Sequence, residues 1–296
     1  MYMQNISRLF LFFLRLLHVD VLVPDWMYLK LLYRRYFNKE LNLNNPITFN
    51  EKLQWLKLYD RRLEYTIMVD KFAVKKYVSN IIGEEFIIPT LGVWDKPEMI
   101  EWNLLPNEFV LKCTHDSGSS IICRDKAKFD IDAAIKKLET CLKKNYYIAG
   151  REWPYKNVPR RIIAEKYMKG TCEDGDLCDY KFFCFNGLVK ALFVGTERNS
   201  GNVKFDYFDA EFNHLDLVQE HPMSGRELAK PKNFDRMKQL ASRLSKGIPQ
   251  VRVDFYNIDG SIYFGEMTFF HHGGIIPFHP EKWDYIFGSW IELPKH

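Results

Sequence analysis

The sequence has few cysteines, and their spacing excludes the common metal and redox motifs. Six cysteines occur in 296 residues, and no two of them form a CxxC pair. No histidine spacing accompanies them that would indicate a zinc site. We therefore expect free, buried thiols in a reducing cytosol.

Long hydrophobic runs are also missing. The most apolar stretch, residues 9–14, is flanked by Arg8 and Arg15 and is much shorter than the roughly 20 residues that span a bilayer. No small-residue cleavage site follows, so a signal peptide is not expected. We expect a cytoplasmic protein whose N-terminal helix packs on the body. The alternative is a helix lying peripherally on the inner membrane, which the aromatic and basic residues that follow keep open: Trp26, Tyr28, Tyr33, Arg34, Arg35 and Tyr36.

Charge is nearly balanced, and repeats and low-complexity tracts are missing. The net charge of +4 suits an anionic substrate such as a nucleotide or an acidic sugar, but it is too small to indicate nucleic acid binding. A hydrophobic content of 47% and an aromatic content of 16% exclude a disordered chain. The length allows two or three packed units.

The order of expected elements predicts an α+β fold with a cleft between two lobes. Helices come first, then a mixed α/β part, then an antiparallel run with one helix. Thr48 and Glu51 form a capping-box pattern at the start of a helix. The expected helices cover residues 1–40 with a break at Pro24, 65–78, 130–144 and 233–246, and the expected strands cover residues 86–91, 109–112, 121–123, 161–168, 180–185, 188–195 and 203–208.

The most informative segment is a predicted β-hairpin near the C-terminus. Residues 250–256 and 262–268 are rich in β-branched and aromatic residues, and Asp259-Gly260 lies between them, which is typical of a tight turn. If the turn centres on Gly260, alternation of side chains leaves an apolar face and a polar face on the hairpin.

On the polar face, Asp254 would lie opposite Glu266, and Arg252 opposite Thr268. Two facing carboxylates repel unless a cation lies between them. Carboxylate oxygens suit Mg²⁺, which usually shares its coordination with substrate phosphates. The competing interpretation is an ordinary solvated polar face.

A small-residue loop follows a buried strand in the middle of the chain. Lys112 ends that strand, and Ser117, Gly118, Ser119 and Ser120 come shortly after it. Small residues let backbone N–H groups approach an anion. The lysine precedes the loop, so this is not a Walker A motif, and a plain surface turn is the alternative.

Two further strands carry polar residues. Glu165, Lys166, Tyr167 and Met168 form an edge at which exposed backbone could pair with an adenine, and Asp179 and Lys181 alternate onto one face of the next strand. Taken alone, each pattern is equally compatible with a solvated strand.

Together these motifs resemble the ATP-grasp superfamily of carboxylate–amine ligases, from about Thr66 to Gly274. A narrower resemblance, to the TupA-like branch, rests on residues 46–57 and 269–274 and covers nearly the whole chain. Members of that branch occur among genes for capsule, lipopolysaccharide and teichuronopeptide synthesis. The motifs of the wider resemblance are Val69-Asp70-Lys71, Pro89-Thr90, Val110-Leu111-Lys112 with Gly118-Ser119-Ser120, Ile163 through Gly170, Asp179-Tyr180-Lys181, Arg252-Val253-Asp254 and Glu266-Met267-Thr268.

The resemblance implies a helical region (residues 1–65) and two ATP-grasp lobes (residues 66–166 and 167–296) with ATP between them. It implies that Lys71 and Lys112 neutralise the phosphates under the Gly118-Ser119-Ser120 loop. The adenine would lie against Glu165, Lys166, Tyr167 and Met168, and the ribose against Asp179. Mg²⁺ would be held by Asp254, Glu266 and Thr268. In the superfamily an asparagine usually stands at the position of Thr268, so the site could hold either one or two metal ions.

The implied reaction joins a carboxylate to an amine through an acylphosphate. Arg252, Lys181 and Arg198 would stabilise its charge, and His271 and His272 would each be a base for the amine or a structural neighbour. Our hypothesis is an amide-forming ligase that acts on an acidic surface sugar, such as a uronic acid, with an amine or amino acid. The alternatives are a glycosyltransferase, for which Asp174-Gly175-Asp176 is the one DxD candidate, and a degenerate nucleotide-binding protein at the membrane.

Overall fold

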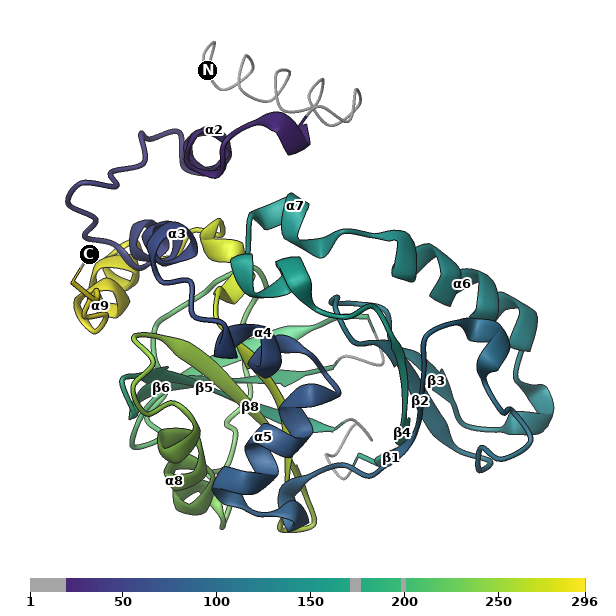
Figure 1. The fold of residues 1–296 in the computed structure, drawn as a ribbon. Coiled ribbons are helices and arrows are strands. Elements are labelled where there is room, and N and C mark those ends of the chain that lie inside the picture. The colour runs from purple at the N-terminus through teal and green to yellow at the C-terminus, as the bar shows by residue number, and fades with distance from the viewer. Residues whose placement is uncertain (1–19, 171–176, 198–200, 296) are drawn as a thin grey trace.

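The computed structural model describes residues 20–170, 177–197 and 201–295, which form two antiparallel sheets with helices around them (Figure 1). The α+β class is therefore confirmed. The apolar run at residues 9–14, Arg198 and the triplet at residues 174–176 lie outside the described residues. In the parts of the chain that are described, no helix has the length and apolar character needed to cross a bilayer.

The smaller sheet has four strands in the order β1-β4-β2-β3, and every neighbouring pair is antiparallel. Helix α6 (Ile131–Lys143) packs on it, and its N-cap Asp130 accepts a hydrogen bond from the Ala133 N–H. Leu138 of this helix and Leu111 of the sheet belong to one buried cluster. The strands are β1 (Thr90–Trp94), β2 (Phe109–Cys113), β3 (Ile121–Cys123) and β4 (Ile162–Lys166).

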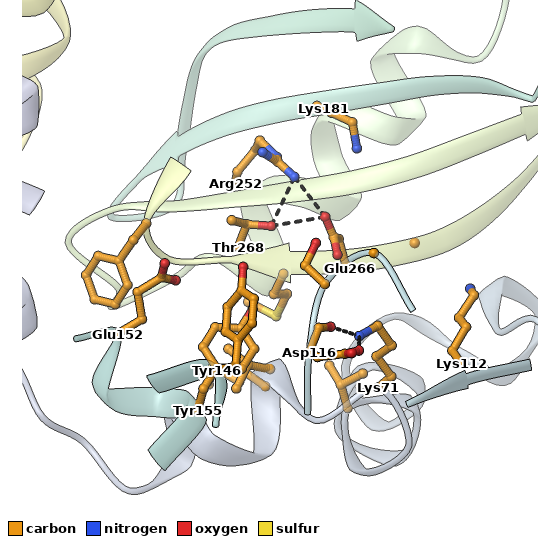
Figure 2. A pocket seen from close by; sticks show the side chains of 18 of the residues that line it. Lys71, Lys112, Asp116, Tyr146, Glu152, Tyr155, Lys181, Arg252, Glu266 and Thr268 are labelled. Atoms are coloured by element: carbon orange, nitrogen blue, oxygen red, sulfur yellow. Dashed lines mark hydrogen bonds and ion pairs between the residues drawn. The ribbon is translucent and has the colours of Figure 1, made fainter. Parts of the chain in front are cut away.

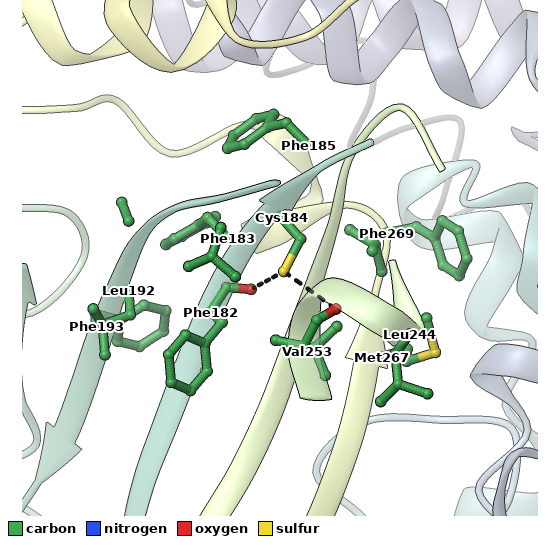
Figure 3. Packing of buried hydrophobic residues seen from close by; sticks show 14 of the residues in the cluster. Phe182, Phe183, Cys184, Phe185, Leu192, Phe193, Leu244, Val253, Met267 and Phe269 are labelled. Atoms are coloured by element: carbon green, nitrogen blue, oxygen red, sulfur yellow. Dashed lines mark hydrogen bonds between the residues drawn. The ribbon is translucent and has the colours of Figure 1, made fainter. Parts of the chain in front are cut away.

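The larger sheet has five strands in the order β7-β6-β5-β8-β9. One face packs on helix α8 (Phe234–Leu244) through apolar side chains such as Phe182 and Val253, which are fully buried (Figure 3). Its polar residues point the other way, toward the smaller sheet. The strands are β5 (Cys178–Phe185), β6 (Leu188–Thr196), β7 (Lys204–Asp209), β8 (Val251–Ile258) and β9 (Ser261–Thr268).

The remaining helices surround the larger sheet or connect elements. Side chains of α3, α4 and α5 join its core cluster, and the capping box predicted at Thr48 is present. The boundaries of the three expected segments stay a prediction. These helices are α2 (Asp25–Phe37), α3 (Phe49–Tyr59), α4 (Glu64–Val69), α5 (Ala73–Ile82), α7 (Tyr146–Gly150) and α9 (Lys282–Ser289), with 3-10 turns η1 (Asp20–Leu22), η2 (Glu84–Phe86), η3 (Pro97–Met99), η4 (Lys126–Lys128), η5 (Trp153–Asn157) and η6 (His271–Gly274).

Two expected elements differ from the structure. The helix predicted over residues 65–78 is broken into α4 and α5, because the Asp70 side chain accepts hydrogen bonds from the N–H groups of Phe72 and Ala73 and starts a new helix. The strand predicted at residues 86–91 begins only at Thr90, since Pro89 has no N–H to donate to a sheet.

The cysteines largely follow expectation. Four of them are buried and free: Cys113, Cys123, Cys141 and Cys184. Cys178 is disulfide-bonded, so the expectation of free thiols throughout is wrong at that position.

Candidate active site

A cavity of about 600 Å³ lies between the two sheets. This volume is within the range of about 300–1,000 Å³ that is usual for sites binding small molecules and cofactors. The smaller sheet and the α4–α5 turn contribute one wall, and β8 and β9 of the larger sheet contribute the other (Figure 2). The predicted site residues that line it are Lys71, Lys112, Gly118, Ser120, Glu165, Asp179, Lys181, Arg252, Glu266, Thr268 and His272.

On the first wall, two lysines share one carboxylate. Glu165 lies 2.7 Å from Lys112 Nζ and 2.5 Å from Lys75 Nζ. Burial acts to raise the pKa of Glu165, but the charges of Lys112 and Lys75 outweigh it and lower the pKa to about 2. Glu165 is therefore an anion at neutral pH, and it fixes both ammonium groups at the edge of the cavity.

Lys71 lies in the turn between α4 and α5, which Asp70 holds in place. The Asp70 side chain caps α5, and its Oδ2 forms an ion pair with Arg161 Nη2 at 2.7 Å. The Lys71 ammonium donates to the carbonyl oxygens of Cys113 and Asp116, and burial lowers its pKa. Its hydrogen bonds go to neutral carbonyls, and the carboxylate of Asp116 lies 3.7 Å away, so an anion in the cavity would compete with Asp116 for this charge.

The small-residue loop borders Lys71. Ser119 is buried, and its hydroxyl donates to Asp116 Oδ1 at 2.6 Å and accepts from the Cys113 N–H at 2.9 Å. Gly118 has φ of 83°, a conformation that side chains rarely adopt, and no atom lies within 4 Å of the place where a Cβ would stand. Ser119 thus supports the loop, whereas Gly118 and Ser120 face the cavity.

The second wall is the predicted hairpin, and the two predicted residue pairs are present. The turn centres between Asp259 and Gly260 rather than on Gly260, and a β-bulge between Asp254 and Phe255 brings the predicted residues opposite each other. Asp254 pairs with Glu266 and Arg252 with Thr268. The Arg252 guanidinium lies between them: Nη2 is 2.8 Å from Asp254 Oδ2, 2.8 Å from Glu266 Oε1 and 3.0 Å from Thr268 Oγ1. The three predicted metal ligands therefore converge on a single cationic nitrogen.

Behind this convergence lies a buried ion-pair network. Lys181 contacts Asp179 at 2.7 Å and also pairs with Asp254, while Arg252 Nε contacts Asp254 Oδ1 at 2.7 Å. Asp254 is only 1% exposed and does not line the cavity. Burial acts to raise the pKa of Glu266, but the charges of Lys181 and Arg252 outweigh it and lower the pKa to about 2.

The donor set fits Mg²⁺ if the nucleotide completes its coordination. No group of three His, Cys, Asp or Glu side chains suited to a metal occurs in the described residues. Glu266 and Thr268 nevertheless open on the cavity, and Asp254 lies directly behind Arg252. Mg²⁺ is commonly bound through one or two carboxylates together with phosphates and water.

The two histidines have different surroundings. His271 is fully buried, with Nδ1 2.9 Å from Arg252 Nη1 and Nε2 2.9 Å from Gln219 Oε1. Burial and the neighbouring charges lower its pKa well below the usual value. With both nitrogens engaged, His271 is placed to position Arg252. His272 Nδ1 contacts Glu220 at 2.8 Å, and its Nε2 has no hydrogen-bond partner among the described residues.

Some predicted site residues are not brought to the cavity wall. Lys166 is exposed, and Tyr167 and Met168 follow the end of β4. Conversely, Lys75, Tyr146, Glu152 and Tyr155 line the cavity and were not predicted. The four-residue spacing between Lys71 and Lys75 could have indicated the first of these. The other three lie in short irregular elements that carry no periodic signal.

A family model for the TupA-like ATPgrasp family matches residues 51–292. Among solved structures, the D-alanine–D-alanine ligase of Bacillus anthracis shows 18% identity over 68% of this chain and 57% of its own, with a TM-score of 0.41. The D-alanine–D-alanine ligase of Helicobacter pylori shows 13% identity. The match covers 82% of this chain and 69% of that ligase, with a TM-score of 0.42. The ATP-grasp ligase PsnB, complexed with minimal precursor, Mg and ADP, shows 8% identity. The match covers 74% of this chain and 57% of PsnB, with a TM-score of 0.39. No curated protein matches the sequence.

The family match, which covers most of the chain, defines a protein of the ATP-grasp class. Within it, the chain belongs to the TupA-like ATP-grasp family. The chain spans little more than half the length of the first D-alanine–D-alanine ligase that it matches.

Proposed function

We propose that this protein is an ATP-dependent carboxylate–amine ligase that forms an amide on an acidic sugar, such as a uronic acid, during the synthesis of capsule or lipopolysaccharide. One observation carries the proposal. Lys71 and Lys112 on one wall face Arg252, Glu266 and Thr268 on the other across one cavity of about 600 Å³. This arrangement suits a nucleotide whose phosphates meet the lysines and whose metal meets the hairpin.

The nucleotide would lie along the first wall. Lys71 and Lys112 would neutralise its phosphates, with Gly118 and Ser120 closing over them. Glu165 and the adjoining backbone would hold the adenine, and Asp179 the ribose hydroxyls. Lys75 supports this role indirectly, because its charge helps to keep Glu165 ionised, and Glu165 holds Lys112 at the cavity edge.

The hairpin would act on the reacting groups. Glu266 and Thr268 would hold Mg²⁺, with Asp254 behind Arg252, and the ion would supply neutralisation of phosphate charge. The substrate carboxylate would attack the γ-phosphate, ADP would leave, and the amine would then displace phosphate from the acylphosphate. The Arg252 guanidinium, which His271 orients, would then stabilise the acylphosphate, with help from Lys181. Catalysis of this kind depends on positioning and charge neutralisation rather than on covalent participation of the protein.

The test is a screen of uronic acids against amino acids with ATP and Mg²⁺. We expect release of ADP and phosphate together with an amide that mass spectrometry detects. Glu266→Gln should abolish turnover, and the exposed Glu101→Gln should not. Asp254→Ala is a poorer probe than the sequence suggested, because it would leave Arg252 and Lys181 buried beside each other without their shared carboxylate.

The glycosyltransferase alternative makes a different prediction in the same assay. Release of UDP or GDP from a nucleotide-sugar without ATP would overturn the ligase proposal, as would full turnover in Glu266→Gln. A location in the cytoplasm with peripheral contact at the inner membrane is also part of the proposal. It rests on the apolar residues 9–14 and on the exposed Trp26 and Tyr36 of α2.

A further inference from the structure

One carboxylate of the cavity makes no hydrogen bond or ion pair with the described residues, although the charge of Lys57 acts on it from farther away. Glu152 precedes the turn η5, is 9% exposed and lines the cavity. Within the described residues, its side chain has no hydrogen bond, and no cation lies within ion-pair distance of it. Burying a carboxylate without a partner is costly. A bound ligand that carries a positive charge would offset that cost.

Glu152 lies at the end of the cavity next to the turn η6. A Cβ at Gly273 would stand 3.6 Å from Glu152 Oε1. The Gly273 carbonyl is itself held by Lys57, whose ammonium donates to it at 2.7 Å and to Gln54 Oε1 at 3.0 Å. Lys57 thus fixes the turn against Glu152, while its hydrogen bonds go to neutral oxygens.

Aromatic rings surround the carboxylate. Tyr146 and Tyr155 line the cavity beside it, with ring centroids 4.7 Å apart. Figure 2 shows both tyrosines near Glu152, whose carboxylate points toward the strand that carries Thr268. A carboxylate among aromatic rings is a favourable environment for an organic cation, whereas an anionic ligand would be repelled.

The charge of Glu152 also affects its neighbours. Burial raises the pKa of Glu152 to about 7 and lowers that of Lys57 to about 8. Burial, followed by the charge of Glu152, raises the pKa values of both tyrosines, so they are neutral phenols. The charges of Lys57 and Glu152 act against burial in both groups, but they do not outweigh it.

We propose that Glu152, with Tyr146 and Tyr155, forms the binding site for the amine substrate and receives it as an ammonium group. The inference rests on the proposed function, since it assigns the second substrate of that reaction. Figure 2 shows Glu152 near Thr268 and on the opposite side of the view from Lys112, with which Glu165 is paired. The amine would therefore enter from the end of the cavity opposite the adenine.

The experiment measures amine binding without requiring the carboxylate substrate. Thermal unfolding of the protein with Mg²⁺ and AMP-PNP is followed while glycine, L-alanine, L-lysine, ethanolamine or D-glucosamine is titrated in. The N-acetylated form of each compound serves as the uncharged ligand control. The variants are Glu152→Gln, Glu152→Asp and the exposed Glu101→Gln, which makes the same charge change outside the cavity.

We expect at least one amine to raise the melting temperature of the wild type and of Glu101→Gln, and its acetylated form to have no effect. In Glu152→Gln the apparent Kd for that amine should rise by about tenfold to a hundredfold, as for a lost charge-assisted hydrogen bond, and Glu152→Asp should recover part of it. A retained shift with AMP-PNP alone shows that Glu152→Gln is folded.

The inference is overturned if AMP-PNP stabilises the wild type but no amine adds to the effect, or if Glu152→Gln binds the amine as well as the wild type does. A wild type that AMP-PNP and Mg²⁺ fail to stabilise would instead overturn the proposed function itself. The two failures are therefore distinguished in one set of titrations.

Discussion

The two walls of the cavity carry net charges of opposite sign. The first wall places three lysines, Lys71, Lys75 and Lys112, beside two carboxylates, Glu165 and Asp116. The second wall places Arg252 and Lys181 among three carboxylates: Asp179, Asp254 and Glu266. The first is therefore electropositive and the second electronegative, which suits an anion on one side and a metal cation on the other.

The walls also differ in how much of their charge is buried. Asp254 and Arg252 are 1% and 7% exposed and hold each other through two hydrogen bonds, whereas the side chain of Lys112 is 22% exposed. We infer that the Arg252–Asp254 pair of the second wall is part of the folded framework, and that Lys112 of the first wall can change its contacts at little cost. Substitutions should therefore affect stability on one side and mainly binding on the other.

The largest effect is expected for Arg252→Met. It leaves Asp254 buried with Lys181 as its remaining cation, and loss of one partner from a buried ion pair costs about 3–5 kcal/mol. We expect the free energy of unfolding in urea to fall by about 3 kcal/mol, near the lower end of that range. Arg226→Met is the control, because its 2.7 Å pair with Glu197 is half-exposed and should contribute less than about 1 kcal/mol. Equal losses in the two variants would contradict the framework role.

Lys112→Met should separate binding from stability. Lys75 would still pair with Glu165, so the free energy of unfolding should change by less than about 1 kcal/mol. The affinity for AMP-PNP with Mg²⁺, measured by calorimetry, should fall by about a hundredfold, which corresponds to about 2.7 kcal/mol. Lys136→Met, on the exposed face of α6, should leave the affinity unchanged. An unchanged affinity in Lys112→Met would place the phosphates elsewhere.

The pH dependence of stability should have opposite signs for Glu165 and Glu152. The pKa of Glu165 is lowered to about 2, so its contribution is present above its ordinary pKa and is lost as the pH falls toward 2. The pKa of Glu152 is raised to about 7, so its ionisation makes the folded state less stable as the pH rises from about 4.5 to 7.

The variant Glu152→Gln removes the contribution of Glu152 to the pH dependence of stability and leaves that of Glu165 in place. At pH 8 the variant should be more stable than the wild type by about 3 kcal/mol, and at pH 4 the difference should vanish. Urea unfolding across this pH range measures it. A variant that is less stable than the wild type at pH 8 would mean that the charge of Lys57 stabilises the ionised Glu152 by more than burial destabilises it.

The smallest effect is expected for Thr48→Ala, outside both walls. Thr48 caps α3 and accepts a hydrogen bond from the Glu51 N–H at 3.2 Å, and loss of such a cap costs about 1 kcal/mol. The affinity for AMP-PNP should not change. A drop in affinity as large as that of Lys112→Met would show that binding merely follows stability, and the distinction between the walls would fail.

The sequence predicted the hairpin better than the surroundings of its side chains. The Asp259-Gly260 turn predicts a hairpin, but a turn closed by Ile258 and Ser261 would by itself set Asp254 opposite Gly265. A β-bulge between Asp254 and Phe255 moves the pairing to Glu266, and no signal in the turn predicts that bulge. The sequence could not predict that Arg252 contacts oxygens of all three expected metal-binding side chains. The rotamer of Arg252 depends on His271 and on the packing of β5. Glu152 could not be found either, since it lies between short elements and its significance comes from what surrounds it in the fold.

The most direct test of the central claim is the affinity of AMP-PNP, measured by calorimetry with and without Mg²⁺, in the wild type and in Glu266→Gln. If a metal–nucleotide complex is bound between the walls, Mg²⁺ should tighten binding in the wild type by about tenfold or more, and Glu266→Gln should lose most of that gain. No binding of AMP-PNP to the wild type, or an equal response to Mg²⁺ in both proteins, would contradict the account.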